Sequence, residues 1–485
     1  MPRSSKYERT LLLLFLLTLP LSNPWVRGDG VGYYAFGRAM LIGGNLDFTK
    51  DWLDANSSFR MGRVGSDGSI NENQFTVTSH LDNHFTIGPA ILWAPFLVTA
   101  HLFVEASHVF GSHVSADGFS SPYRIAMALG TALYGFLAIW FSFLLARKYC
   151  GEKWAFVAAI GIWFASSLPV YMYFNPSWAH AHSAFVAALF LWYWDRTRAA
   201  RTWKQWLILG GIGGLMMDVY YVSAILLIIP LMESLAEYWK GLQAREIDRV
   251  SKLFICNVIF VMAIFVVFAP TLLTKKIIYG SYLNFGYTER WFWKSPALLK
   301  VCFSAEHGLF SWTPILLLSV AGLFLLRRYD RDLSFFLAGG FLFYLYAIGC
   351  YENWSGISSF GNRFFISLTP LFVMGLASFF GWIASMWRDR RATTFAWSVT
   401  ALFVLWNMGL IFQWGTHLIS SRGPISWREA AYNQVAVVPA QSIHTVEAYL
   451  SRRGRLMERL EQQDMQRLKE QNKKPSNPPP VEDNE

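Results

Sequence analysis

Residues 28–54 read GDGVGYYAFGRAMLIGGNLDFTKDWLD and follow closely behind the apolar run from Leu11 to Leu19. This stretch places Asp29, two tyrosines, Arg38 and further carboxylates where a membrane-spanning segment would reach the lipid headgroups. A carboxylate at that depth could meet a reactive group carried on a lipid. The plainer interpretation is that these acids keep an extracytoplasmic loop soluble, and the charge pattern alone does not separate the two.

The chain as a whole is too apolar for a water-soluble protein. Of its 485 residues, 54% are hydrophobic, 17% aromatic and 15% charged, and the mean hydropathy is +0.29. A bilayer requires roughly 20 apolar residues per span. Runs of this kind recur at 11–27, 87–107, 122–146, 154–173, 177–194, 205–235, 253–273, 308–326, 332–350, 363–386 and 395–414. We therefore expect an all-α polytopic membrane protein of about 11–12 transmembrane helices, depending on whether 205–235 crosses twice.

The first apolar run has some features of a signal peptide, because Arg3, Lys6 and Arg9 precede it. The segment LPLSNPWVRGDG that follows contains no small-residue cleavage site, which favours a retained first helix. The net charge of +10 comes mostly from short basic loops. That distribution is typical of membrane topology and not of nucleic-acid binding, so no nucleic-acid partner is expected.

Clustered Lys and Arg residues predict which loops face the cytoplasm. They occur in five connections, at 147–153, 196–204, 240–252, 327–331 and 388–391, and the positive-inside rule makes all five cytoplasmic. The outward connections are then 174–180, about 218–222, 275–307 and 351–363, joined by the large first loop 28–86. The sequence thus predicts a protein of the cell inner membrane whose polar loops gather on the extracytoplasmic side.

Two segments fit this count poorly. An odd number of crossings must separate residue 86 from Arg147, yet two apolar runs lie between them. Either 87–107 is interfacial or re-entrant, or 205–235 crosses once and some basic loops face outward. The tail 415–485, separate from the transmembrane domain 1–414, has basic residues that favour the cytoplasm, whereas the crossing count places it outside. We expect an amphipathic helix around 442–470 and a disordered end, KKPSNPPPVEDNE.

His180 and His182, in NPSWAHAHSAF, enter an apolar span. An ionisable side chain is costly there and is more often functional than decorative, although a packing role for a single histidine has about equal weight. Residues i and i+2 on a helix point in different directions, and spacing fixes no third ligand. The four cysteines are scattered, without a CxxC or Cys/His cluster. We therefore expect neither a metal site nor a disulfide framework.

Two later segments carry further candidates beside outer span ends. EHGLFSWTP contains Glu306 and His307, and WSGISSFGNRFF contains Arg363. Their glycine and serine residues would let backbone approach a ligand. A guanidinium at Arg363 could hold a phosphate through two N–H groups. Taken alone, however, an arginine reaching up to the lipid headgroups is an equal alternative.

The order of these segments resembles bacterial members of the GT-C glycosyltransferase superfamily. It is similar to the branch containing protein O-mannosyltransferases and lipid A aminoarabinose transferases, over about residues 10–415. The motifs are GDGVGYYAFGRAMLIGGNLDF, DNHFTIGPAILWAPF, FNPSWAHAHSAFVAALFLW, AEHGLFSWTPILL and WSGISSFGNRFFISLTPLF. The resemblance implies a multi-spanning fold whose first outer loop contributes the active site, and a donor sugar linked to a polyprenyl phosphate.

By position, the resemblance implies roles for three residues. Asp29 matches the family's first-loop catalytic acid, His180 lies where relatives have a polar residue after an outer-side proline, and His84 lies where they have a basic residue before a proline-containing turn. The chain departs from the family in having Gly30 directly after Asp29 and Thr86 in that turn. The other candidate substrate-binding residues are Tyr33, Arg38, Asp47, Glu306, His307 and Arg363.

Together with the resemblance, these observations predict a glycosyltransferase, and they indicate no cofactor, with a divalent metal left open. The enzyme would move a sugar from a polyprenyl-phosphate-linked donor to a lipid, glycan or protein acceptor at the outer face of the membrane. Asp29 would take the acceptor proton in an inverting displacement, and Arg363, with His84 or Arg38, would stabilise the departing phosphate. The alternative is a transporter or flippase of a lipid-linked or anionic substrate, against which the long first loop and the lack of repeat halves weigh.

Overall fold

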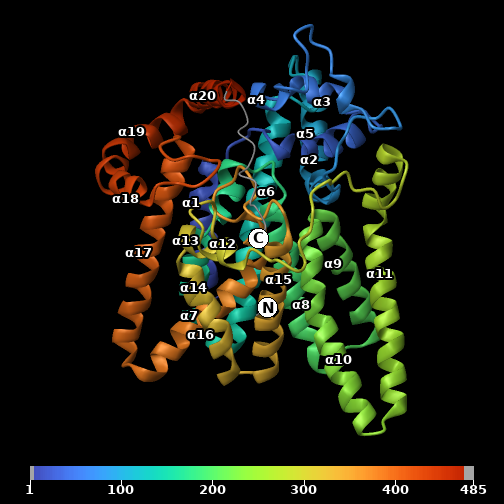
Figure 1. Cartoon of the computed structure of the whole chain (residues 1–485), viewed down its shortest axis with the longest axis vertical. Coiled ribbons are helices and arrows are strands. Elements are labelled where there is room, and N and C mark those ends of the chain that lie inside the picture. The colour runs from blue at the N-terminus through green and yellow to red at the C-terminus, as the bar shows by residue number, and fades with distance from the viewer. Residues whose placement is uncertain (1–4, 474–485) are drawn as a thin grey trace, which may run out of the picture.

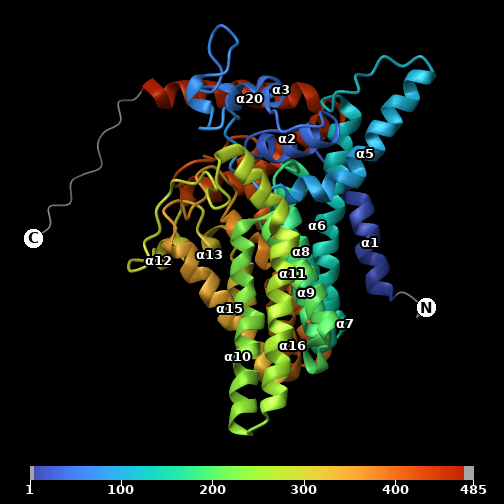
Figure 2. The same ribbon diagram turned by 90° about the vertical axis from the view of Figure 1, so that its right-hand side faces the viewer.

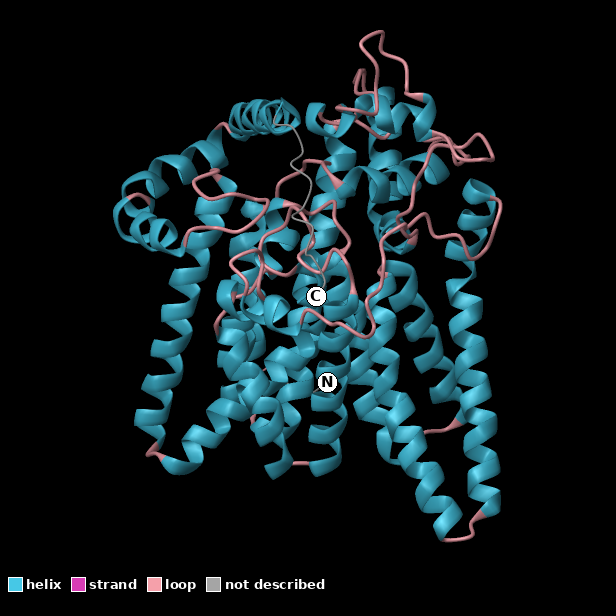
Figure 3. Ribbon diagram, in the orientation of Figure 1, coloured by secondary structure: helices cyan, strands magenta, loops and turns pink. Residues whose placement is uncertain are grey.

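The computed structural model describes residues 5–473, and within them the chain is helical with no strand. Long helices stand side by side, and most of the loops and short helices gather at one end of the bundle (Figures 1 and 3). We call this end, which carries α2 (Asp29–Leu41), α3 (Thr49–Asp54) and α20 (Arg453–Lys473), the site end. The opposite end is called the basic end.

Seven helical stretches among residues 5–473 are long and apolar enough to cross a membrane. They are α5 (Gly88–Val109), α6 (Ser121–Cys150), η5 with α10 (Tyr221–Leu227, Ile228–Gln243), α11 (Ile247–Tyr279), α15 (Arg331–Cys350), η7 with α16 (Arg363–Leu368, Thr369–Met386) and α17 (Asp389–Gly415). The other expected spans are shorter helices: α1 (Lys6–Thr18), α7 (Glu152–Phe164), α8 (His180–Thr197), α9 (Trp203–Val219) and α14 (Ile315–Leu325). The chain is a multi-pass membrane protein, as predicted.

Further short elements connect the long helices. They are η1 (Leu19–Leu21), α4 (Ser57–Arg60), η2 (Glu72–Gln74), η3 (Val170–Phe174), α12 (Leu298–Phe303), α13 (Leu309–Trp312), α18 (Trp427–Ala436) and α19 (Val438–Ser451). Near the basic end lie η4 (Arg198–Ala200) and η6 (Leu326–Arg328).

Helix α16 lies at the centre of the bundle, where α6, α7, α8, α14 and α17 all pack against it. Small residues allow its closest approach, which is to α14. A Cβ on Gly322 would lie 1.8 Å from the carbonyl oxygen of Gly375, and one on Gly375 would lie 2.0 Å from that of Ser319. Glycine on both helices therefore brings the two backbones together, as is common between helices in membranes.

The apolar stretch 205–235 crosses the bundle twice. Helix α9 ends at Val219, and Tyr220 is extended, with φ −160° and ψ 113°. The chain then returns through η5 and α10, which pack on α15. The outward connection expected at about 218–222 is thus confirmed.

The path of α5 explains how two apolar runs can lie between residue 86 and Arg147 while the chain crosses the membrane an odd number of times. It runs against only the half of α6 nearer the site end, because Tyr134 donates to the Leu92 carbonyl (2.9 Å) and the ring of His101 meets the Tyr123 hydroxyl (2.7 Å). Beyond these contacts α5 leans away from the bundle, still at the site end (Figure 2). The chain therefore enters and leaves α5 on the same side, in agreement with the interfacial or re-entrant interpretation of 87–107.

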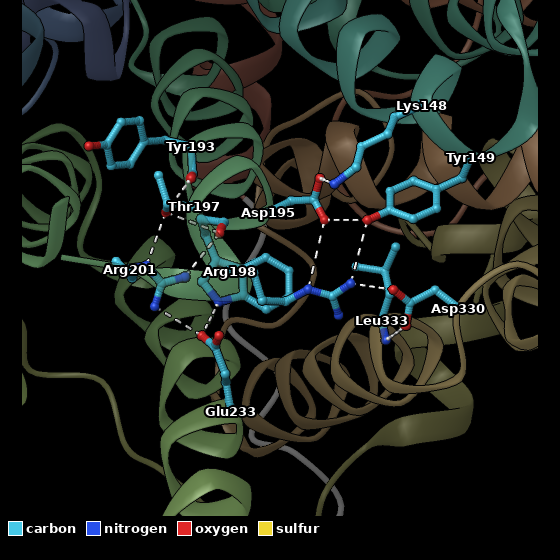
Figure 4. A network of polar contacts seen from close by, with 11 residues as sticks. Lys148, Tyr149, Tyr193, Asp195, Thr197, Arg198, Arg201, Glu233, Asp330 and Leu333 are labelled. Atoms are coloured by element: carbon cyan, nitrogen blue, oxygen red, sulfur yellow. Dashed lines mark hydrogen bonds and ion pairs between the residues drawn. The ribbon is translucent and has the colours of Figure 1, made fainter. Parts of the chain in front are cut away.

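Basic connections meet at the opposite end. Figure 4 shows Asp195 between Lys148 and Tyr149, with Nζ of Lys148 2.8 Å from Oδ2 of Asp195. Arg198, from the next connection, pairs with Asp330 before α15. Lys153 reaches Asp389, the first residue of α17, at 2.8 Å. These contacts tie four of the five predicted cytoplasmic connections to one end of the molecule.

The tail returns to the site end. Two helices, α19 and α20, occupy the region in which one amphipathic helix was expected, and they are separated at Arg452. Helix α20 lies across the site end, level with α3 (Figure 2), and packs on α4. This places the tail on the side of the first loop, as the crossing count indicated and its basic composition did not. Of the end KKPSNPPPVEDNE that was predicted to be disordered, Lys473 is the last residue of α20, and residues 474–485 lie outside the described residues.

Candidate active site

A cavity of about 440 Å³ opens at the site end between segments far apart in the sequence. Its walls come from the first outer loop, the 171–178 turn, the 356–363 loop, the turn after α17, and α20. The charged residues and histidines that line it are Arg27, Asp29, Arg63, His84, Arg363, His417, Arg422, Asp464 and Arg467. Because arginines outnumber carboxylates, the cavity suits an anionic ligand.

Asp29 and Arg363, two of the predicted site residues, form an ion pair in this cavity. Nη1 of Arg363 lies 2.6 Å from Oδ2 of Asp29, and the Asp29 side chain remains 34% exposed. Asp29 is in the first turn of α2, where the helix dipole favours a negative charge. The guanidinium of Arg363 stacks over the ring of Trp178 at 4.7 Å, and its buried Nε has no partner among the described residues. Arg363 therefore keeps one hydrogen-bond donor free beside a reachable carboxylate.

The start of α2 sits tightly against the 171–178 turn. A Cβ on Gly30 would lie 1.9 Å from Oγ of Ser177, so no larger residue fits there without displacing the turn. The ring nitrogen of Trp178 donates to the Arg27 carbonyl at 3.0 Å. The glycine that follows Asp29, in place of a second acid, thus has a steric reason.

Glu306 and His307 hold the loop that carries Arg363, and neither lines the cavity. Nδ1 of His307 donates to the Ser355 carbonyl at 2.9 Å, and the Ser355 hydroxyl donates to Glu306 at 3.3 Å. Inside the same loop, the side-chain Nδ2 of Asn362 donates a hydrogen bond to the carbonyl of Trp354 at 3.0 Å. Glu306 and His307 thus hold the loop that carries Arg363 in place and do not line this cavity.

His84 lines the cavity on the side of the first loop. Its ring packs on Phe85 (4.2 Å between ring centroids) and Tyr287 (5.0 Å). Burial lowers the pKa of His84 below its usual value, against the opposing pull of Asp82 and Asp29. Lys275, which is fully buried, holds the two flanking residues by donating to the carbonyls of Asn83 (2.9 Å) and Phe85 (2.7 Å).

His180 and Tyr33 are buried beside the cavity without lining it. The ring of His180 lies edge-on to Tyr171 at 4.7 Å, whereas His182 packs on Trp93 at 4.9 Å, so the two histidines point apart. Within residues 5–473 no group of three or more His, Cys, Asp or Glu side chains could hold a metal ion. Burial raises the pKa of Tyr33 well above its usual value, which keeps the phenol protonated.

Arg38 and Asp47 lie away from the cavity. Nε of Arg38 is 3.0 Å from both carboxylate oxygens of Asp51, and its Nη2 donates to the Asp47 carbonyl at 2.9 Å. The Asp47 side chain instead accepts from Thr49 at 2.9 Å. The Arg38–Asp51 pair is buried and pins α3 to α2. Arg38 therefore has a structural role in this loop, and it is not available to a ligand in the cavity.

Sequence reasoning missed several residues of the cavity. Arg27 and Arg63 come from the first outer loop, and the rest come from the tail and the turn before it: His417, Arg422, Asp464 and Arg467. The available signal was the basic, amphipathic character of the tail together with a crossing count that placed it outside. Only the fold shows that α20 lines the same cavity as Asp29.

A second cavity, of about 540 Å³, adjoins the first. It is lined mainly by apolar side chains of α17, α19 and α20, including Leu405, Ile411 and Val446. The two cavities share five lining residues: Arg27, Asn175, Trp414, Gly415 and Leu460. A molecule with a charged head and a long apolar tail could occupy both, with its charge near Arg27.

Comparison with known proteins gives a weak likeness only. No family model matches the chain, and no curated protein matches it. Two solved structures of ArnT from Cupriavidus metallidurans resemble the fold at 14% identity. The one bound to undecaprenyl phosphate has a TM-score of 0.48 over 85% of this chain and 71% of its own. The apo structure has a TM-score of 0.49 over 93% and 72%. A likeness of this size assigns no activity, so the function rests on the site.

Proposed function

We propose that this chain is a membrane glycosyltransferase that takes a sugar from a polyprenyl-phosphate-linked donor. The observation that carries the proposal is the continuity of the arginine-lined cavity with the apolar cavity, beside Asp29. An apolar cavity suits a polyprenyl chain, the arginines suit a phosphate, and a carboxylate within reach of both supplies a base. The acceptor is a hydroxyl group of a lipid, a glycan or a protein.

In the proposed reaction, Asp29 takes the proton of the acceptor hydroxyl as its oxygen attacks the anomeric carbon of the sugar. The bond from that carbon to the phosphate oxygen breaks, and polyprenyl phosphate leaves with the bonding electrons. A single displacement of this kind inverts the anomeric configuration. A positioned general base typically contributes about 100- to 10,000-fold in rate.

Arg363 would assist the leaving group. Its guanidinium pairs with Asp29 at 2.6 Å. A donor phosphate beside its unpaired Nε would draw the guanidinium away from Asp29 and free the carboxylate to act as a base. Electrostatic stabilisation of a departing anion by a fixed cation is often a large part of catalysis.

We further propose that the site end faces away from the cytoplasm. The basis is the positive-inside rule, since the clustered basic connections meet at the opposite end. Donor and acceptor would then meet at the outer face of the inner membrane.

Transfer of a radiolabelled sugar from a polyprenyl-phosphate donor to endogenous acceptors, in membranes that contain the protein, tests the proposal. Overproduction of the protein should raise incorporation into acceptor material. Movement of intact labelled donor across the membrane, with no incorporation, would instead identify a flippase and overturn the proposal.

A further inference from the structure

Helix α20 reaches into the arginine-lined cavity with a carboxylate of its own. Oδ2 of Asp464 lies 2.8 Å from Nη2 of Arg27, and Oδ1 lies 3.2 Å from Nε2 of His417. Arg467, one turn further on, donates to the His417 carbonyl at 3.0 Å. Burial raises the pKa of Asp464, but the contacts with His417 and Arg27 outweigh it and hold that pKa below its usual value. Asp464 is thus an anion bound by two groups of the cavity wall.

Arg27 stands where the two cavities join. It lines both the arginine-rich cavity and the apolar cavity, and its guanidinium stacks on Trp25 at 4.7 Å. A lipid whose chain filled the apolar cavity would present its phosphate at this junction. Phosphate oxygens can make the same charge-assisted bonds to a guanidinium that a carboxylate makes, so Asp464 and such a phosphate would compete for Arg27.

Helix α20 is attached in a way that would let it move. The half-buried side chains of α20 recur with helical spacing, so they form the face turned toward the bundle. None of the described side chains of α20 is fully buried. Polar contacts hold much of the helix in place. Glu461 accepts hydrogen bonds from the side chain of Asn56 (2.9 Å) and from the backbone N–H of Ser58 (2.6 Å), and Asp464 accepts one from Arg27. A helix without core residues opens at low free-energy cost, and these bonds dominate that cost.

We infer that Arg27 and His417 form a phosphate-binding subsite for the lipid donor, and that Asp464 acts as a latch on α20 by occupying this subsite until the phosphate binds. The inference rests on the proposed function, because the phosphate is that of the polyprenyl donor. When the phosphate takes Arg27, Asp464 loses its partner and meets a like charge, so this end of α20 is released. The same movement opens the cavity beside Asp29 to an acceptor.

Binding of undecaprenyl phosphate to the full-length protein in lipid nanodiscs tests the subsite. Asp464→Asn removes the competing charge and should tighten binding roughly tenfold, the equivalent of one charge-assisted hydrogen bond. Arg27→Gln should weaken binding, and in that background Asp464→Asn should no longer tighten it. Glu458→Gln, the same change on the exposed face of α20, is the matched control and should leave the affinity unchanged.

Hydrogen exchange of the α20 amides gives a second, independent measurement. In the wild type, undecaprenyl phosphate should speed exchange around Asp464 about tenfold, and the Asp464→Asn protein should exchange fast without lipid. Inorganic phosphate is added in a parallel arm: if it alone reproduces the effect, the subsite recognises free phosphate and the lipid assignment is overturned.

The outcomes separate this inference from the proposed function. Lipid binding that Asp464→Asn weakens or leaves unchanged would make Asp464 a fixed part of the wall and overturn the latch, while the proposed function stands. A wild-type protein that binds no undecaprenyl phosphate would overturn both.

Discussion

Nη1 of Arg363 meets Oδ2 of Asp29 across 2.6 Å, joining the start of α2 to a loop 334 residues further along the chain. The pair places a cation and a potential base in one cavity beside an apolar one. Neither group is fixed by a full set of partners, since Nε of Arg363 is unpaired and Asp29 is partly exposed. The pair is therefore suited to separate when an anion arrives.

Arg363 should not be replaceable by lysine. A guanidinium can hold a phosphate through two bonds while a lysine supplies a point charge, so Arg363→Lys should lower transfer at limiting donor by roughly tenfold or more, and Arg363→Ala further. Steady-state kinetics at low donor concentration measures this. Arg388→Lys, an exposed change at the basic end, is the control. Equal activity of the wild type and the Arg363→Lys protein would mean that the residue only reaches toward headgroups.

His84 should make the protein less stable in acid. Its pKa in the folded chain is lowered by burial, whereas an unfolded histidine titrates near about 6.5. Below that pH the unfolded chain binds the proton and the folded chain resists it, so stability falls as the pH falls. Thermal unfolding at about pH 7.5 and about pH 5.5 should show a larger drop for wild type than for His84→Gln.

The matched control for this pH effect is His444→Gln, because His444 is exposed on α19. The melting temperature of this variant should fall with pH by as much as that of the wild type. A wild-type drop in melting temperature no larger than that of His84→Gln would exclude the buried ring as the cause.

Lys275 should stabilise the folded protein by holding residues 83–85 in place. Lys275→Met leaves the carbonyls of Asn83 and Phe85 without their donor and should lower the free energy of unfolding by about 2 kcal/mol or more. Lys276→Met removes only an exposed bond to Gly280 and should change stability by about 0.5 kcal/mol or less. Denaturation in detergent compares the two variants, and equal losses would contradict the positioning role.

The site end and the basic end should lie on opposite sides of the membrane. In a chain whose own cysteines are replaced, cysteines at Asn73, Ser281 and Ser451 should react with an impermeant thiol reagent in spheroplasts. Those at Ser251 and Arg390 should react only after lysis. Protection at Ser451 with reaction at Asn73 would detach the tail from the site, and the reverse pattern for the whole set would invert the topology.

The topology could be predicted from the sequence where charge and hydropathy act locally. Basic clusters identified the connections of one end, and the polar break in 205–235 marked the turn at Tyr220. The path of α5 was not predictable, because hydropathy reports the length of an apolar run and not its tilt or depth. Its position depends on contacts such as Tyr134 to the Leu92 carbonyl, which only the fold provides.

The site was predictable in part. Asp29, His84 and Arg363 do line one cavity, since each lies beside an apolar helix at the site end. Arg38 looked equally suitable, but the fold of the first loop brings Asp51 against it, and sequence alone gives no sign of that pairing. The position of Asp464 in the cavity could not be predicted for another reason. The sequence of an amphipathic tail helix does not show which surface of the protein the helix covers.

The most direct measurement is sugar transfer by Asp29→Asn protein in nanodiscs, with a polyprenyl-phosphate donor and extracted acceptor material. The amide keeps the shape of the side chain but cannot take a proton, so turnover should fall by about 100-fold or more while protein abundance and donor binding persist. Asp67→Asn, an exposed acid of the same loop, should keep full activity. Near wild-type turnover by the Asp29→Asn protein would contradict the assignment of Asp29 as the catalytic base.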